Sequence, residues 1–355
     1  MECSVQWGVV HTVRNFQGRQ ELVVEVGSTC SRAMNYPDLT GVCQPGDRVL
    51  LNTTAELLQL GTGGWHYVLA VHGRERSLSK MGHIMKLRYT PLQGRTLSVE
   101  EPDSPYHEVM ERADSLHGLP VAVGSLHSML APFAWTVHHA GQVRRLAYLM
   151  SDGAALPLGF SRVVSALKTR GLVHKTITFG HAFGGDLEAV NIYSALLAAK
   201  HVAKADLAVV LMGPGVVGTE TTWGTTALEQ GVFLNAVLQL GGAAVAIPRL
   251  SEKDSRERHQ GISHHTRTVL SKVVQGPVYV PMPDYYLTLF TDPNHTAELG
   301  QHVSWEGTAD SYANLSQAGL EFSTMGRGPA DDPLFFHGVL ASAQFCLRLL
   351  QAVET

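Results

Sequence analysis

Arginine and histidine gather in one stretch of the chain, residues 248–266, whose sequence is PRLSEKDSRERHQGISHHT. Arg256 and Arg258 stand two residues apart there, and His259 follows Arg258 directly. Guanidinium groups bind carboxylates and phosphates through charge-assisted hydrogen bonds, and a histidine beside them can move a proton near neutral pH. The stretch therefore predicts a site for a small anionic ligand, phosphorylated or carboxylated, although a solvated surface loop can have the same composition.

Ser263 is placed to cap a helix that begins within the same stretch. That helix would carry His264 and His265 in its first turn, where cationic side chains oppose the helix dipole. We therefore expect neutral imidazoles, which can act as a base, as a metal ligand or as a hydrogen-bond donor. His264 and His265 are accordingly candidate catalytic residues, and Ser263 is a candidate ligand-binding residue.

A second loop, residues 213–226, reads GPGVVGTETTWGTT and precedes another expected helix. Amides and hydroxyls at a helix start suit a phosphate or a carboxylate. The ligand-binding candidates in this loop are Gly213, Gly215, Gly218, Thr219, Thr221 and Thr222. The alternative is a flexible turn whose threonines cap the helix, and Glu220 would repel an anion unless it is paired.

A third loop, GHAFGGDLE, follows an apolar segment and contains His181 and Asp186. Together with His264 or His265 they could bind a divalent metal ion, the candidate cofactor, but no diagnostic spacing such as HExxH is present. Asp186 could instead cap the following helix, and His181 could be a buried core histidine. Asp152, directly after another strand, could be a ligand, a catalytic base or a turn former. No Walker A sequence is present, so a P-loop nucleotide is not predicted, and a nicotinamide is not expected either.

Four stretches of the sequence, which include the loops described above, resemble one known family. They are MSDGAALPLGFSRVV, GHAFGGDLEAVNIYSALLAAK, MGPGVVGTETTWGTTALEQG and RHQGISHHT, and the NTTA and LGTGG motifs within residues 52–64 are similar to the family's N-terminal region. The family is the bacterial domain-of-unknown-function family numbered 3866. The resemblance covers most of the chain and implies a bacterial, cytosolic protein, but it implies no reaction type.

The elements between these loops must position them, and from Leu119 onward apolar segments of strand length alternate with amphipathic helical segments. The expected strands are Val121–Val123, Leu146–Met150, Thr176–Phe179, Leu207–Met212, Ala243–Ile247 and Val278–Met282. Their continuous apolar character indicates burial on both faces, as in a parallel sheet. The expected helices span residues 161–170, 187–203, 224–240 and 263–274, with a last one opened by Asp332-Pro333. The pattern predicts a Rossmann-like α/β domain in residues 119–355, with a doubly wound, mainly parallel sheet in three layers and loops that converge at the carboxyl ends of its strands.

Residues 1–90 contain short β-branched and aromatic runs separated by turn signals, which predict a small barrel or compact sandwich. Residues 91–118 are more polar and are expected to form a connection. Over residues 1–80, Lys and Arg balance Asp and Glu at seven each, so the basic stripe of a nucleic-acid groove is not expected.

The 355-residue chain has a formal net charge of −4, so no global field attracts nucleic acid or an acidic membrane. The start of the sequence lacks a signal-peptide pattern, no apolar run reaches membrane-spanning length, and four cysteines without a C-x-x-C pair suit a reducing compartment. We expect a cytoplasmic protein without nucleic-acid or membrane partners, and a homo-oligomer stays open. The leading hypothesis is an enzyme that acts on a small anionic substrate through histidine acid–base or metal-assisted chemistry. The alternative is a non-catalytic ligand-binding or regulatory module that uses the same loops.

Overall fold

The computed structural model describes residues 2–58, 64–78, 81–141, 143, 145–290, 299, 302–308 and 315–354. The chain divides into two compact units, which are Met1–Leu97 with Pro157–Arg162, and Ser98–Leu156 with Val163–Thr355. The expected ranges 1–90, 91–118 and 119–355 did not anticipate that a short segment within the α/β region belongs to the N-terminal unit.

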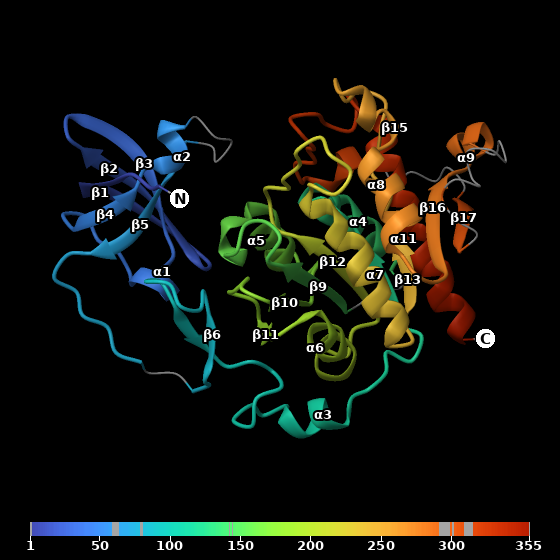
Figure 1. Cartoon of the computed structure of the whole chain (residues 1–355), viewed down its shortest axis with the longest axis horizontal. Coiled ribbons are helices and arrows are strands. Elements are labelled where there is room, and N and C mark those ends of the chain that lie inside the picture. Colours follow the sequence, from blue (N-terminus) through green and yellow to red (C-terminus); the bar gives the residue numbers. More distant parts are fainter. Residues whose placement is uncertain are drawn as a thin grey trace. The chain divides into compact units, whose positions relative to one another are not determined.

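The N-terminal unit contains a closed barrel of five strands in the order β1-β2-β3-β5-β4 (Figure 1). Its elements are β1 (Val5–Phe16), β2 (Arg19–Val26), β3 (Thr29–Asn35), α1 (Pro37–Thr40), β4 (Arg48–Asn52), α2 (Thr54–Leu57) and β5 (His66–Val71), followed by the paired strands β6 (Ile84–Lys86) and β7 (Gly94–Thr96). β3 and β5 pair in parallel, and the other barrel pairs are antiparallel. The predicted small β barrel is confirmed.

Arg19 explains why Pro157–Arg162, which includes the 3-10 turn η2 (Leu158–Phe160), belongs to the barrel unit. The Arg19 side chain is buried, and its Nη1 donates a hydrogen bond of 2.8 Å to the carbonyl of Gly159. Glu21 accepts hydrogen bonds from both Arg19 and Arg162. A buried guanidinium needs such partners, and the segment supplies one of them.

The second unit is built on one eight-stranded sheet in which every pair is parallel, in the order β11-β10-β9-β12-β8-β13-β16-β17. The strands are β8 (Pro120–Val123), β9 (Leu146–Ser151), β10 (Lys175–Phe179), β11 (Leu187–Ala189), β12 (Leu207–Met212), β13 (Ala243–Ala246), β16 (Val278–Pro283) and β17 (Val303–Thr308). The six predicted strands are confirmed. β11 and β17 were not predicted, because they are the two edge strands and their partly exposed residues lack a continuous apolar run.

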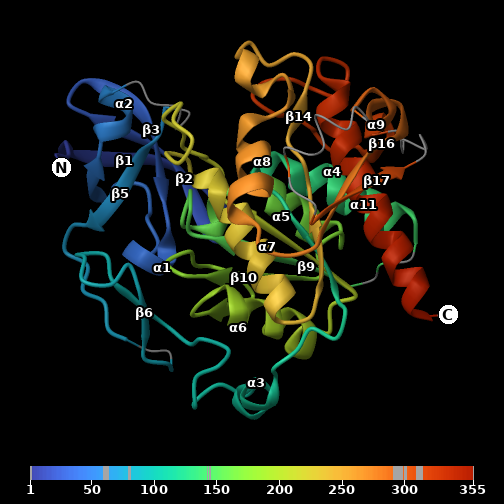
Figure 2. The same cartoon turned by 45° about the vertical axis from the view of Figure 1, so that its right-hand side comes forward.

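Helices cover both faces of this sheet, which makes three layers (Figures 1 and 2). The α-helices of the unit are α3 (His107–Arg112), α4 (Leu130–His139), α5 (Arg162–Thr169), α6 (Ile192–Leu197), α7 (Glu229–Gln239), α8 (His264–Thr268), α9 (Asp284–Phe290) and α11 (Pro333–Glu354). Val121 and Leu149 share one core with residues of α6 and α7, while Ala122 and Tyr148, their neighbours in sequence, are buried outside that core. Successive strand residues point to opposite faces, so the second set faces the layer in which α4 packs against α11.

The helix expected over 187–203 begins later than predicted. Leu187–Ala189 instead pairs with β10 as β11. The side chain of Asn191 accepts hydrogen bonds from the amides of Tyr193 and Ser194 in a capping box, so α6 begins at Ile192 and continues into a π-helical turn, η3 (Ala198–Val202). Asp186 is therefore not the helix cap that the sequence suggested.

Pro333–Ala352 of α11 is long and apolar enough to cross a membrane by length and composition alone, and 67 % of its most apolar stretch is buried inside the protein. Its residues Phe335, Phe336 and Leu340 are almost fully buried. No apolar run of this length was expected from the sequence, but the segment is largely buried and forms a core helix of the α/β unit in this structure.

Gln230 of α7 joins two strands at their carboxyl ends. Its Nε2 donates hydrogen bonds of 2.8 Å to the carbonyl of Val123 and of 2.9 Å to that of Ile247, and the side chain is buried. We predict that Gln230→Leu lowers the free energy of unfolding by about 1–3 kcal/mol, since two buried carbonyls lose their partner. Gln239→Leu on the exposed side of the same helix is the control in urea unfolding, and equal losses in both variants would contradict the prediction.

Candidate functional site

All strands of the sheet run in the same direction, so the loops after β9, β12 and β13 leave from one edge. The amide of Ala155 donates to the carbonyl of Pro214 at 3.0 Å, which joins the first loop to the second. A Cβ on Gly218 would lie 3.5 Å from the ring of His265, which brings the second loop against the third. Three of the predicted loops thus meet through direct contacts.

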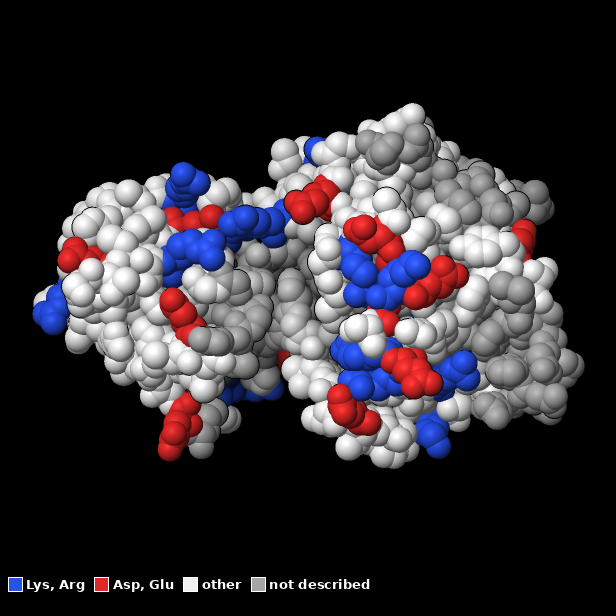
Figure 3. All heavy atoms as spheres, turned by 90° about the horizontal axis from the view of Figure 1, so that it is seen from above, with Lys and Arg blue, Asp and Glu red and all other residues white. Residues whose placement is uncertain are grey.

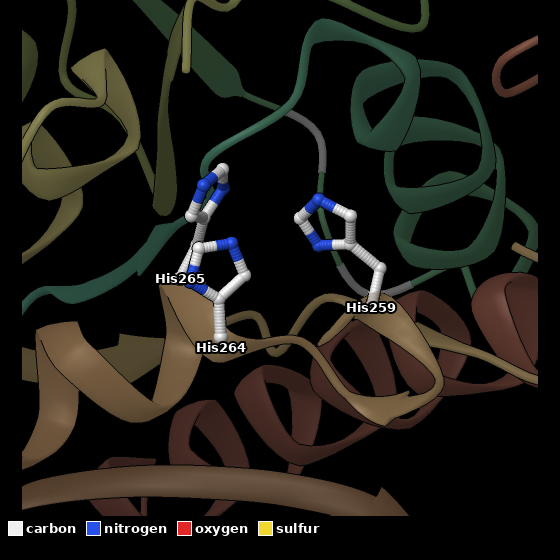
Figure 4. A group of neighbouring side chains, drawn as sticks. All are labelled: His259, His264 and His265. Carbon is white, nitrogen blue, oxygen red and sulfur yellow. The ribbon is translucent and has the colours of Figure 1, made fainter. Parts of the chain in front are cut away.

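Three histidine side chains point toward one another at this edge (Figure 4). His259 comes from the 3-10 turn η5 (Glu257–His259), and His264 and His265 open α8. Each ring offers one nitrogen such that these atoms all lie within 4.8 Å of one another. Among the described residues this is the one group of at least three His, Cys, Asp or Glu with metal-ligand geometry. We call it the histidine cluster.

Ser263 holds the histidine cluster together. Its Oγ caps α8 by accepting a hydrogen bond from the amide of His265 at 3.3 Å, as the sequence predicted, and it lies 2.7 Å from Nδ1 of His259. Ser263 is fully buried, and its two hydrogen bonds orient His259 and the start of α8. A hydroxyl bonded to one ring nitrogen fixes the ring and leaves the other nitrogen to face the cluster.

The three imidazoles are neutral at physiological pH. Burial, assisted by the charge of Arg249, lowers the pKa of His259 to about 3. Burial also lowers the pKa of His265 to about 4, with the neighbouring His264 as the next cause. The pKa of His264 is lowered by burial and then by the charge of Arg258. The expectation of neutral imidazoles therefore has a physical cause beyond the helix dipole, and their lone pairs are available.

Two ring nitrogens of the histidine cluster are buried without a hydrogen-bond partner. They are Nε2 of His264 and Nδ1 of His265, and Nε of Arg258 has no partner either. An unpaired buried polar atom costs free energy, and such atoms are unusual in folded proteins. Each of the two ring nitrogens accepts or donates according to the tautomer of its imidazole, and the Arg258 Nε–H is a donor that an acceptor atom would satisfy.

Asp254 fixes the loop that carries the cluster. The buried carboxylate pairs with Arg249 at 3.0 Å and with Arg256 at 2.9 Å, and Arg327 lies 3.7 Å away. Burial alone would raise the pKa of Asp254, but the hydrogen bonds and charge of Arg256 outweigh it and hold this pKa well below its usual range. Arg256 was predicted to bind an external anion, and in this structure an internal carboxylate binds it.

The loop 213–226 is closed by its own hydrogen bonds. The amide of Thr219 donates to the carbonyl of Gly224 at 2.8 Å, and the hydroxyl of Thr221 accepts from the amide of Gly224 at 3.0 Å. Thr225 caps the 3-10 turn η4 (Thr226–Leu228) by accepting from the amide of Ala227. Thr219 and Thr221 are thus engaged within the loop, Thr222 is exposed, and the threonine-capped turn describes the loop better than an open cradle of amides does.

His181 and Asp186 are not brought together. The Asp186 carboxylate pairs with Lys168 and accepts from the amide of Thr176 at 2.9 Å, near the start of β10. His181 follows the end of β10, and a strand rises about 3.3 Å per residue, so the two attach at opposite ends of that strand. Asp152 accepts from the amide of His181 at 2.8 Å, which makes it a loop-fixing residue of the carboxyl edge.

Glu229, the first residue of α7, was missed in the sequence. Its carboxylate accepts from Ser151 Oγ at 2.8 Å and lies so close to Gly153 that a Cβ there would be 2.3 Å from it. Burial and then the charge of Asp152 raise the pKa of Glu229, against the hydrogen bond from Ser151, which lowers it. A glutamate in the first turn of a helix is common for electrostatic reasons alone, so the sequence carried no signal for it.

Acidic and basic side chains are interspersed on the face seen in Figure 3, without a large patch of one sign. The ion pairs of the site follow this pattern, since Arg256 pairs with Asp254 and Arg258 pairs with Glu220. Long-range attraction of a polyanion needs an excess of one sign, so recognition here depends on short-range contacts.

The fold and the site define an α/β protein with an N-terminal five-stranded barrel and a histidine cluster at the carboxyl edge of a parallel sheet. Residues 32–343 match the family described as "Protein of unknown function (DUF3866)", and the chain belongs to this family. The resemblance indicated by the loop motifs is thereby confirmed. No curated protein matches the chain, and no solved structure matches it.

Acid should destabilise the protein through the histidine cluster. Unfolded histidine titrates near pH 6.5, whereas burial lowers the pKa of folded His265 to about 4, so the unfolded state binds more protons between these values. We predict that the free energy of unfolding falls as pH is lowered from about 6.5 to 4. His265→Gln should make this fall shallower in urea titrations at several pH values, and the exposed His138→Gln should not. Identical pH slopes in all three proteins would show that the cluster does not titrate as described.

Proposed function

We propose that this chain is a metal-dependent enzyme that acts on a small anionic substrate, with His259, His264 and His265 as the metal ligands. The observation that carries the proposal is the histidine cluster itself, in which three neutral imidazoles converge and two buried ring nitrogens lack partners. Three histidines with an open fourth position are typical of catalytic zinc sites. Zinc in such a site lowers the pKa of bound water and polarises a carbonyl or phosphoryl oxygen.

The charges around the cluster are compatible with a bound cation. Asp254 pairs with both Arg249 and Arg256 and balances one of their two positive charges, and Arg258 is paired with Glu220. The arginines therefore depress the histidine pKa values without leaving several uncompensated charges beside the metal position. This arrangement supports metal binding at neutral pH, because protons do not compete for the ring nitrogens.

We assign proton transfer in the proposed reaction to Glu229. α7 begins directly after η4, and η4 packs against α8, which carries His264 and His265. A carboxyl group whose pKa is raised by burial suits general acid–base catalysis better than an exposed one does. The four cysteines are free, which supports the proposed cytoplasmic location, and the family resemblance supports a bacterial source.

A structural metal site is the second candidate, because His259 and His265 are only 1 % and 6 % exposed. Like the non-catalytic ligand-binding or regulatory module expected from the sequence, this candidate involves no catalysis. Hydrolysis of p-nitrophenyl acetate and p-nitrophenyl phosphate by zinc-loaded protein separates the two. Turnover that disappears in Glu229→Gln supports the enzyme, while bound zinc that raises the melting temperature without turnover supports the structural role.

Zinc titration tests the ligand set. We predict that the wild-type protein binds about one zinc ion and that His264→Ala or His265→Ala weakens binding by more than the 10–100-fold typical of losing an outer-shell partner. His181→Ala should bind zinc as the wild type does, because His181 lies outside the cluster. The measurement is competition with a chromophoric chelator, with elemental analysis of the purified proteins.

Two outcomes would contradict the proposal. Wild-type protein that binds no zinc, manganese, iron or cobalt at micromolar concentration would remove the metal site. Loss of metal in His181→Ala, with metal retained in His264→Ala, would instead favour the metal site at His181 and Asp186 that the sequence suggested.

A further inference from the structure

Of the three arginines near the histidine cluster, Arg249, Arg256 and Arg258, only Arg258 pairs with an exposed carboxylate. Its Nη2 lies 3.0 Å from Oε1 of Glu220, and the side chains of Arg258 and Glu220 are 32 % and 72 % exposed. Asp254, in contrast, is buried, as is its partner Arg249, while its second partner Arg256 is 40 % exposed. An ion pair with such an exposed partner is weak and opens easily, whereas the Asp254 pairs belong to the fold.

The backbone of Glu220 is held in a conformation that L-amino acids rarely adopt, with φ at +66°. The hydrogen bonds between Thr219 and Gly224 close the loop around this position, so the loop imposes the conformation. A non-glycine residue in a left-handed conformation persists only where its surroundings determine it, and such positions cluster at ligand sites. The loop therefore presents the Glu220 carboxylate to Arg258.

Glu220 does not pair with every donor of the Arg258 guanidinium group. Its carboxylate pairs with Nη2 of Arg258, whereas Nε of Arg258 is buried and has no hydrogen-bond partner among the described residues. A carboxylate that lies in the plane of a guanidinium accepts from Nε and a terminal nitrogen at once. An external carboxylate in this two-point arrangement would satisfy the buried Nε–H that Glu220 leaves unpaired.

The surroundings favour a carboxylate over a phosphate. The amides of Val217, Thr219, Gly224, Thr225 and Thr226 all donate within the loop, so they are not directed at a ligand. A phosphate has more acceptor oxygens than one guanidinium edge can serve and is bound best by several converging amides. A carboxylate needs only the two donors that Arg258 offers.

We infer that Arg258 is the carboxylate-binding residue of this site and that Glu220 occupies the place of a ligand carboxylate when no ligand is bound. The inference rests on the proposed function and names its substrate class as small carboxylic acids. Arg258 directly precedes His259 of the histidine cluster in η5, so a carboxylate bound at Arg258 lies beside that cluster. Glu220 then acts as an internal competitor that an incoming carboxylate displaces.

The test is a calorimetric titration with succinate, acetate and inorganic phosphate at constant ionic strength, on protein freed of metal by a chelator. Without metal, a carboxylate cannot bind through an ion, and constant ionic strength removes differences in screening. We expect Glu220→Gln to bind succinate about 1.4- to 5-fold more tightly than the wild type, since an exposed ion pair of about 0.2–1 kcal/mol no longer competes. Glu220→Gly should do the same, and Arg258→Gln should bind neither carboxylate.

Glu108→Gln is the matched control, because Glu108 forms an exposed pair with Arg112 on α3, away from the loops of the carboxyl edge. It should bind succinate as the wild type does. Equal affinity in wild type and Glu220→Gln, undiminished binding in Arg258→Gln, or a preference for phosphate in Glu220→Gln would each overturn the inference. Zinc titration of the same preparations keeps the two proposals apart: zinc binding with failed carboxylate binding overturns only this inference, whereas absent zinc binding overturns the proposed function.

Discussion

Burial of both faces of the parallel sheet is the constraint on which the rest of the α/β unit depends. The residues of β8, β9 and β12 are buried throughout, so these strands can carry only apolar or internally paired groups. Parallel strands also end at the same edge. Polar chemistry is therefore confined to the loops after the strands, and the contacts between the 151–156, 213–226 and 248–266 loops follow from that confinement.

At this edge, internal carboxylates set the properties of the histidines. Asp254 binds Arg249 and Arg256 and keeps their charges close to the histidine cluster, where they add to burial in lowering the histidine pKa values. The same pairing engages the Arg256 guanidinium with an internal carboxylate. Arg258 differs because its carboxylate partner, Glu220, is exposed.

Much of the fold could be predicted from the sequence, because a strand buried on both faces reads as a continuous apolar run and a helix end is marked by its cap. Ser263 was predicted correctly as a cap for this reason. The edge strands β11 and β17 carry no such run, and Leu187–Ala189 was taken into a helix because Asp186 resembles a cap as much as Asn191 does. The site was predicted in part: His264 and His265 are local to one helix start, but their contact with His259 and the pairing of Arg258 with Glu220 depend on tertiary structure. The role of Asp186 was not predicted, because its hydrogen-bond partner Thr176 lies ten residues earlier in the sequence.

The central claim is that the histidine cluster binds a metal ion. Its most direct test is a crystal structure of zinc-soaked protein with diffraction data recorded on both sides of the zinc absorption edge. The account predicts one strong anomalous peak about 2.0–2.1 Å from a ring nitrogen of each of His259, His264 and His265. A fully occupied zinc site elsewhere, or an empty cluster whose ring nitrogens are bridged by water at saturating zinc, would contradict it.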